Sequence, residues 1–382
     1  MRLRHPPGHD GSRRARAVWR NPRARRFTLP DSRNRTGAAM KQVLFALLCV
    51  LLPAVVAAGQ ETAAPWCVSV WHPSPGTTGG DETIRVNRDV LDVVHPFWYS
   101  PRPDGTIYAH PGLENPQQIT EWRDLGLIII PSIPSSVFEM LSPAETRAFH
   151  VQQIVELVET KGYDGIDIDY EGFPASTRDD FSAFIEELST ALHARGKLLT
   201  IAVHAKTDDA GTWPGAAAQD WARIAPAVDV FSIMTYDYTS RSDPPGPISP
   251  TPWVLDVLAY AESIVDLSKV RLGLPFYGYS WQRSRPPATT ISWESIQPLI
   301  ASFKLEVQRD PGGDAYVELN ARGLPRQTFY VADSAALEYK LDQVLAAYPQ
   351  LGGVAIWGIG GEDPANWDVL RAARPSNCQR QP

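Results

Sequence analysis

Three carboxylates stand at alternate positions in the stretch Asp-Gly-Ile-Asp-Ile-Asp-Tyr-Glu, residues 164–171. Side chains alternate between the two faces of a β-strand, so Asp167, Asp169 and Glu171 share one face and the apolar residues between them share the other. Burying such a row is costly unless the carboxylates have partners, and their mutual repulsion raises some of their pKa values. Catalytic sites use this arrangement to keep a carboxylic acid protonated near neutral pH. The alternatives are a solvated acidic edge or a Ca²⁺ site, but calcium-binding loops place glycine and asparagine in turns rather than β-branched residues.

The strand that carries these carboxylates is one of a series of apolar segments that alternate with helical patterns. We expect eight strands, at residues 67–71, 93–99, 126–133, 163–171, 198–205, 229–238, 271–281 and 352–360. Helical periodicity covers residues 143–162, 176–196, 251–265 and 333–349. This alternation predicts an α/β protein, a (β/α)8 TIM barrel, whose active site would lie at the carboxyl ends of the strands, where Glu171 stands. A doubly wound open sheet is the alternative, but no GxGxxG dinucleotide loop follows the first strand.

The spacing between the seventh and eighth expected strands is too long for one helix. Residues 282–331 contain a helical pattern and two short strand-like segments, AYVEL and QTFYV. We therefore expect a small α+β insertion on the carboxyl-terminal face of the barrel, where it would wall one side of a cleft.

The amino-terminal part of the chain differs in charge from the rest. Residues 1–39 contain 11 Arg against two acids, which leaves residues 40–382 with a net charge of −16. An acidic body is a poor nucleic-acid binder, although the basic stretch alone could be an RNA-binding arm. From Met40, a lysine, an apolar run at 43–56 and small residues at 56–59 are typical of a secretory signal peptide. We expect a signal peptide at 40–59, and residues 1–39 to be an over-extended gene model or an atypical leader.

The remaining residues, 60–382, are expected to form one secreted or periplasmic catalytic barrel that acts as a monomer. A membrane anchor is less favoured, because the apolar run is shorter than the ~20 residues of a membrane span and contains Pro53. Cys67 and Cys378 remain after cleavage, one near each end of the mature chain. An even pair in an oxidising compartment predicts a disulfide, and two unpaired thiols are the alternative.

The carboxylate motif resembles a known signature. The stretch DGIDIDYE matches the DxxDxDxE signature of the family 18 glycoside hydrolases, the chitinase-like barrels, at every fixed position. Met234 to Asp237 resembles the M-x-Y-D motif of their sixth strand, and residues 272–278 resemble the G-x-P-x-Y-G motif of their seventh. The resemblance covers roughly residues 66–370, and GPISPTPWV (246–254) and WGIGGED (357–363) are similar to the branch with spore-cortex lytic enzymes and chitobiase.

The resemblance implies a mechanism in which the 2-acetamido oxygen of the substrate attacks the anomeric carbon, with retention of configuration. Glu171 would protonate the leaving oxygen and then activate water, and Asp169 would orient the acetamide. Asp167 would share a proton with Asp169, and Tyr236 would hydrogen-bond the acetamide oxygen. The implied substrate is a glycan that contains N-acetylglucosamine, a chitooligosaccharide or peptidoglycan, cleaved at β-1,4 bonds. No cofactor or metal is implied.

Further residues are implied to bind the sugar. Trp357 would stack beneath the sugar ring, and Asp237 would contact the sugar or Glu171. We also expect sugar contacts from Met234, in the M-x-Y-D motif, and from Tyr277, in the G-x-P-x-Y-G motif. Other tryptophans near strand ends, such as Trp71 and Trp253, and the strand histidines His95 and His204 are more simply explained by packing.

The sequence departs from the family pattern at one place, and there are two alternatives to the implied function and mechanism. The family's S-x-G-G on strand three is replaced by Pro-Ser-Ile-Pro at residues 131–134, which argues against hydrolysis of crystalline chitin. A sugar-binding relative without catalysis is the rival from another class, but such relatives commonly lose the terminal glutamate that this chain keeps as Glu171. An ordinary acid–nucleophile pair of Asp169 and Glu171 is a third reading, but both would approach the sugar from the same side.

Overall fold

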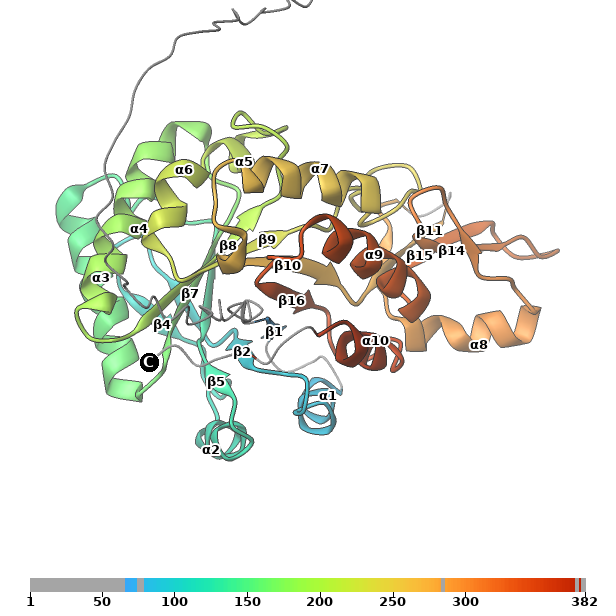
Figure 1. Ribbon diagram of the computed structural model, residues 1–382, viewed down its shortest axis with the longest axis horizontal. Helices are drawn as coiled ribbons and strands as arrows, with labels where there is room; N and C mark the ends of the chain where they lie inside the picture. The colour runs from blue at the N-terminus through green and yellow to red at the C-terminus, as the bar shows by residue number, and fades with distance from the viewer. Residues whose placement is uncertain (1–65, 74–78, 283–285, 375–377, 379–382) are drawn as a thin grey trace, which may run out of the picture. The chain divides into compact units, whose positions relative to one another are not determined.

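Parallel strands form the central sheet of this α/β fold (Figure 1). The computed structural model describes residues 66–73, 79–282, 286–374 and 378, so the expectations for residues 1–39 and 40–59 lie outside the described part. The strands run in the order β5 (Ile128–Ile129), β2 (Val93–Pro96), β1 (Cys67–His72), β16 (Gly353–Trp357), β10 (Val270–Pro275), β9 (Val230–Met234), β8 (Leu198–His204), β7 (Gly165–Tyr170) and β6 (Ser132–Ser135).

The two edges of this sheet are one interrupted strand. Only two residues separate β5, which pairs with β2, from β6, which pairs with β7, so the sheet closes on itself through the expected third strand. The main-chain nitrogen of Asp164 also donates to the Ile129 carbonyl across this closure. The expected (β/α)8 barrel is therefore confirmed, and the open doubly wound sheet is excluded.

Helices follow the strands as the sequence pattern predicts. Their bounds are α1 (Gly80–Val86), α2 (Pro116–Asp124), α3 (Ala144–Lys161), α4 (Arg178–His193), α5 (Pro214–Ala217), α6 (Trp221–Ile224), α7 (Thr251–Glu262), α8 (Trp293–Phe303), α9 (Ser334–Ala347) and α10 (Asn366–Ala373). Helix α3 ends at Gly162, which has a left-handed φ of 67°. Helix α9 begins after Asp333, whose side chain accepts from the main-chain nitrogen of Ala336 at 3.0 Å.

The prediction of one continuous seventh strand is wrong. Residues 271–281 divide into β10, which belongs to the barrel, and β11 (Gly278–Gln282), which belongs to a second sheet. Pro275 ends β10, since proline has no N–H to donate to a neighbouring strand. A Cβ at Gly278 would clash with the Tyr330 carbonyl, so glycine lets β11 lie close to the neighbouring strand that contains Tyr330.

The insertion is an antiparallel sheet with one helix, which confirms the expected α+β character. Its strands run in the order β12 (Thr289–Ile291), β11, β15 (Gln327–Val331), β14 (Ala315–Leu319) and β13 (Gln308–Arg309). Helix α8 accompanies this sheet, and both lie at one side of the barrel (Figure 1). The insertion thus begins with β11 rather than at residue 282. A small hairpin of β3 (Tyr99–Pro101) and β4 (Ile107–Ala109) follows β2.

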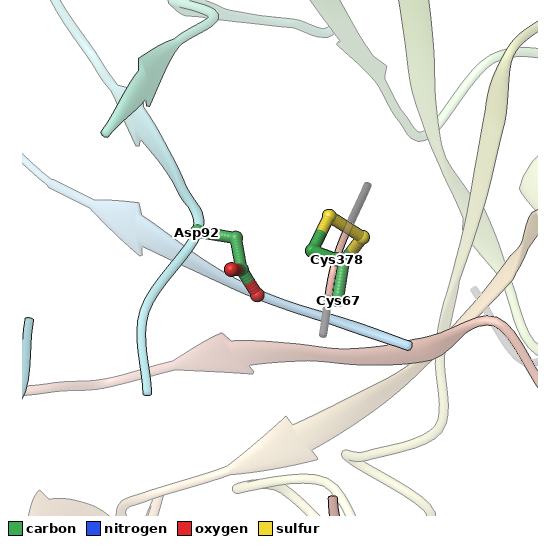
Figure 2. A group of neighbouring side chains, drawn as sticks. All are labelled: Cys67, Asp92 and Cys378. Atoms are coloured by element: carbon green, nitrogen blue, oxygen red, sulfur yellow. A yellow bond between two sulfur atoms is a disulfide. The ribbon is translucent and has the colours of Figure 1, made fainter. Parts of the chain in front are cut away.

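A disulfide joins Cys67, the first residue of β1, to Cys378, with the two Cα atoms 4.7 Å apart. Figure 2 shows this bond with the carboxylate of Asp92 nearby. Asp92 accepts from the Val68 nitrogen at 2.8 Å and from Arg374 at 2.8 Å, so it anchors the same region through a second set of contacts. None of the helices in the described part of the chain is both long and apolar enough to cross a membrane.

Candidate active site

Strand β7 carries Asp167 and Asp169 inside the barrel, and Glu171 directly follows the strand. Residues Ile166 and Ile168 are fully buried in the apolar core, while Asp167 and Asp169 occupy the opposite face. Asp167 has no exposed surface, and its two oxygens accept from the Trp71 indole at 3.1 Å and the Thr200 hydroxyl at 2.5 Å. These two donors compensate the loss of water around a buried carboxylate.

Asp169 and Glu171 are the two carboxylates nearest the carboxyl end of this strand. Burial, reinforced by the negative charges of Glu171 and Asp167, raises the pKa of Asp169 well above its usual range. Burial and the charge of Asp237 raise the pKa of Glu171 to about 7, against a hydrogen bond with Asp169 that lowers it. Asp169 and Glu171 thus hold protons more firmly than exposed carboxyl groups do, and a hydrogen bond joins the two side chains.

The expected M-x-Y-D residues begin at Met234, the last residue of β9, and continue into the loop after it. Burial and the charges of Asp169 and Glu171 raise the pKa of Tyr236, so its hydroxyl remains a hydrogen-bond donor. Asp237 has a left-handed φ of 56°, an uncommon conformation for a residue with a side chain. Its Oδ1 accepts from the hydroxyls of Tyr277 at 2.5 Å and Tyr279 at 2.6 Å.

A cleft of about 610 Å³ opens over these residues. Its lining residues are Glu171, His204, Ala205, Lys206, Thr207, Thr212, Trp213, Met234, Tyr236, Asp237, Tyr238 and Trp253. The side chain of Glu171 is 45% exposed there, while Asp169 lies behind it at 7%. The cleft therefore presents one carboxyl group, hydrogen-bonded to a second carboxyl group behind it at the same strand end, an arrangement suited to general acid–base chemistry.

Two expected sugar-binding residues do not line this cleft. Trp357 stands at the end of β16, where its ring lies 5.5 Å from that of Phe97 and packs near Met234 and Tyr236. Tyr277 is buried and reaches the site through its hydrogen bond to Asp237.

The side of the cleft that follows β8 was not predicted from the sequence. His204 ends that strand and Trp213 lies in the loop beyond it, 41% exposed, with its ring edge-on to the imidazole at a centroid distance of 4.5 Å. Trp71, expected to pack, supports the catalytic row through its indole N–H. Their position in the sequence could have indicated this role, because residues directly after a barrel strand lie at the active-site face of the barrel.

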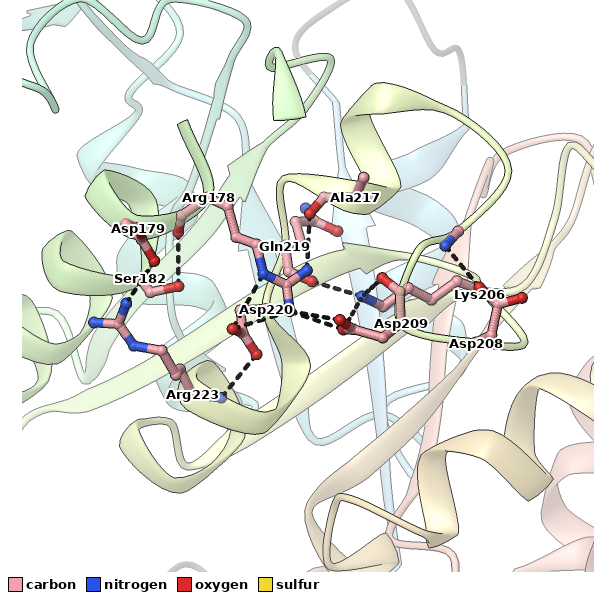
Figure 3. A network of polar contacts seen from close by, with 11 residues as sticks. Arg178, Asp179, Ser182, Lys206, Asp208, Asp209, Ala217, Gln219, Asp220 and Arg223 are labelled. Carbon is pink, nitrogen blue, oxygen red and sulfur yellow. Dashed lines mark hydrogen bonds and ion pairs between the residues drawn. The ribbon is translucent and has the colours of Figure 1, made fainter. Parts of the chain in front are cut away.

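A polar network holds the loop that carries Trp213 (Figure 3). The buried ammonium of Lys206 donates to the main-chain oxygens of Asp209 at 3.1 Å and Gln219 at 2.8 Å. Arg178 pairs with Asp209 at 2.8 Å and with Asp220 at 2.9 Å, and so ties the loop to the start of α4. Hydrogen bonds and ion pairs therefore hold both ends of the loop that carries Trp213.

Replacing Asp237 by asparagine is expected to shift the pH profile of activity to lower pH. The charge of Asp237 helps to raise the pKa of Glu171 to about 7, so its removal lets Glu171 lose its proton at lower pH. A general acid must be protonated, so the alkaline limb of kcat/KM should move down by roughly 1 pH unit. Asp342→Asn, on the exposed face of α9, is the control. An unchanged or upward-shifted limb would contradict this electrostatic coupling.

Comparison with known proteins adds to this geometry. The family model for Glycosyl hydrolases family 18 matches residues 90–362. The cortical fragment-lytic enzyme of Bacillus subtilis is 25% identical over 306 residues, 76% of this chain and 69% of that protein. YdhD of Bacillus subtilis is 35% identical over 164 residues, which span only 39% of its length. The crystal structure of a chitinase from Chromobacterium violaceum superposes with a TM-score of 0.73 and 25% identity, covering 81% of this chain and 99% of that one.

Proposed function

The chain belongs to the glycosyl hydrolases of family 18, a chitinase-like and cortex-lytic family of glycosidases, and from that premise we propose that it cleaves β-1,4 bonds beside N-acetylglucosamine with help from the substrate's own acetamido group. The observation that carries the proposal is the pair of Asp169 and Glu171 at one strand end. Both side chains approach a sugar from the same side, so they do not flank its ring as an acid and a protein nucleophile would.

The proposed reaction has two steps. Glu171 first gives its proton to the glycosidic oxygen while the C1–O bond breaks and the acetamido oxygen bonds to C1. Asp169 supports the resulting oxazolinium ion, and Tyr236 donates a hydrogen bond to the acetamide. Water then attacks C1 while the bond between C1 and the acetamido oxygen breaks, Glu171 takes the proton from that water, and the product retains its anomeric configuration. A pKa of about 7 suits Glu171 to both roles near neutral pH.

The substrate class follows from the acetamido requirement and from the relatives. Chitinases and cortical fragment-lytic enzymes both stand among the proteins that this chain resembles, so chitooligosaccharides and peptidoglycan glycan strands are the two candidates. Incubation with both, followed by mass spectrometry of the products, tests the proposal. Cleavage next to N-acetylglucosamine in either glycan supports it, and intact glycans of both kinds would overturn it.

We propose that the enzyme acts outside the cytoplasm. The signal-like segment at residues 40–59 and the Cys67–Cys378 disulfide support this, because structural disulfides persist in oxidising compartments. Protein exported by cells that express the full chain is expected to begin near Gly59 or Gln60 and to contain no free thiol. N-terminal sequencing and a thiol titration under denaturing conditions decide it, and a retained 1–39 segment or two free thiols would contradict the expectation.

A further inference from the structure

His204 stands beside the proposed general acid without a role in the mechanism described above. It ends β8 next to β7, and its Nδ1 lies 3.5 Å from Oε2 of Glu171. The imidazole side chain is only 12% exposed, against 45% for Glu171. The glutamate therefore extends into the cleft, while the histidine beside it is almost enclosed.

The imidazole is held on several sides. The main-chain nitrogen of His204 donates to the side-chain oxygen of the buried Gln219 at 2.7 Å. The amide nitrogen of Gln219 donates in turn to the Tyr170 carbonyl at 3.2 Å, one residue before Glu171. Gln219 thus fixes the end of β8 against the end of β7, and the Trp213 ring covers the imidazole from the cleft side. The distance between the His204 and Glu171 backbones is therefore set by the fold.

The imidazole is neutral under the conditions in which Glu171 works. Burial lowers the pKa of His204 to about 4, so the ring carries a single proton near neutral pH. The ionisable groups that line the cleft with it are Glu171 from β7, Lys206 from its own loop, and Asp237 and two tyrosines from the loop after β9. Of the described carboxylates, only Glu171 pairs with His204 within 4.0 Å. Nε2 is buried without a partner among the described residues, so the ring has one productive direction, through Nδ1 towards Glu171.

We propose that His204 is a positioning residue that donates its Nδ1–H to the Glu171 carboxylate and holds that side chain over the sugar. The contact matters most after Glu171 has given up its proton, when the carboxylate must be aimed at the incoming water. Such hydrogen bonds are often long in the free enzyme and shorten when substrate is bound. This inference rests on the proposed role of Glu171 as acid and base, and it adds a residue that the sequence motifs do not contain.

Two substitutions separate positioning from simple packing. In His204→Asn the amide nitrogen stands close to where Nδ1 stood, so a donor to Glu171 is kept. His204→Leu fills the space without a donor. We expect kcat on an aryl chitobioside to fall ~10- to 100-fold in His204→Leu, with KM within about two-fold, and most of kcat to return in His204→Asn. If His204→Leu does not fold, His204→Gln replaces it, because its amide reaches the Nε2 position instead.

The matched control is His193→Asn. His193 also pairs with a carboxylate, Asp229, at 2.9 Å, but it lies at the end of α4, away from the cleft. Its variant should keep wild-type kcat and KM. Equal losses of kcat in His204→Asn and His204→Leu, or a loss confined to KM, would overturn the proposal.

A second readout does not depend on turnover. A hydrogen bond to the charged form lowers the pKa of a carboxyl group, so its loss should raise the pKa of Glu171. NMR titration of carbon-13-labelled glutamate is expected to show this rise in His204→Leu and not in His204→Asn. An unchanged pKa of Glu171 in His204→Leu would contradict the positioning role of His204, even if the wild-type protein hydrolysed no chitobioside. Inactivity of the wild type with the expected shift would instead count against the proposed function alone.

Discussion

Replacement of Glu171 by glutamine is expected to abolish turnover while glycan binding remains. The amide keeps the shape of the side chain at the mouth of β7 but has no proton to give to the leaving oxygen. Loss of a general acid typically costs ~10²–10⁴ in rate, and the cost rises when the leaving group is an unactivated sugar. The measurement is kcat on N-acetylated oligosaccharides, with binding followed by calorimetry on the same variant.

The matched control for this experiment is Glu338→Gln, the same change on the exposed face of α9. It should leave both turnover and binding at wild-type levels. Near-normal rates in Glu171→Gln would show that another group supplies the proton. A loss of binding together with turnover would instead show that the substitution disturbs the cleft, in which case the assignment of Glu171 would have to rest on its pH profile.

Removal of the acetyl group from the sugar on the non-reducing side of the cleaved bond is expected to stop hydrolysis almost completely. In the proposed reaction the substrate supplies its own nucleophile, because Asp169 and Glu171 approach the sugar from one side. An intramolecular group acts at an effective concentration of up to ~10⁵–10⁸ M, and this advantage disappears with the acetamide. The deacetylated glycan should still bind, because the lining of the cleft is unchanged.

The assay compares matched acetylated and deacetylated oligosaccharides by NMR of the first product formed. The acetylated substrate should give a product of retained configuration. Equal rates on both substrates, or an inverted product, would refute substrate assistance and indicate a protein nucleophile. A thiazoline that resembles the oxazolinium ion should inhibit the enzyme tightly, as compounds similar to reaction intermediates do.

The strand that carries the carboxylates could be predicted because its pattern is local. Alternation along residues 164–171 separates the carboxylates from the isoleucines in any β-strand, and the structure places Asp167 and Ile168 on opposite faces. The division of the seventh expected strand at Pro275 was not predictable in the same way. Residues 271–281 are apolar or aromatic at most positions, and only the pairing of β11 with β15 shows that the chain has entered another sheet.

The other side of the cleft depends on contacts between distant segments. The pairing of His204 with Glu171 joins residues 33 positions apart, and the pKa of Glu171 depends on Asp237, which follows β9. Neither contact follows from residue type or spacing. The signal that identified Tyr236 and Asp237 was their resemblance to a motif, whereas His204 and Trp213 belong to no such motif and were recognised only from their place at the cleft.

The link between Cys67 and Cys378 makes the described barrel a closed covalent ring. A single cut by a protease in any surface loop between these two residues opens the ring but separates nothing, since both new ends remain attached through the sulfur bridge. Exposed loops are the places where proteases cut folded proteins most readily. A nicked molecule would therefore retain all of its strands as one particle, with the pieces held at the high mutual concentration that favours their continued association.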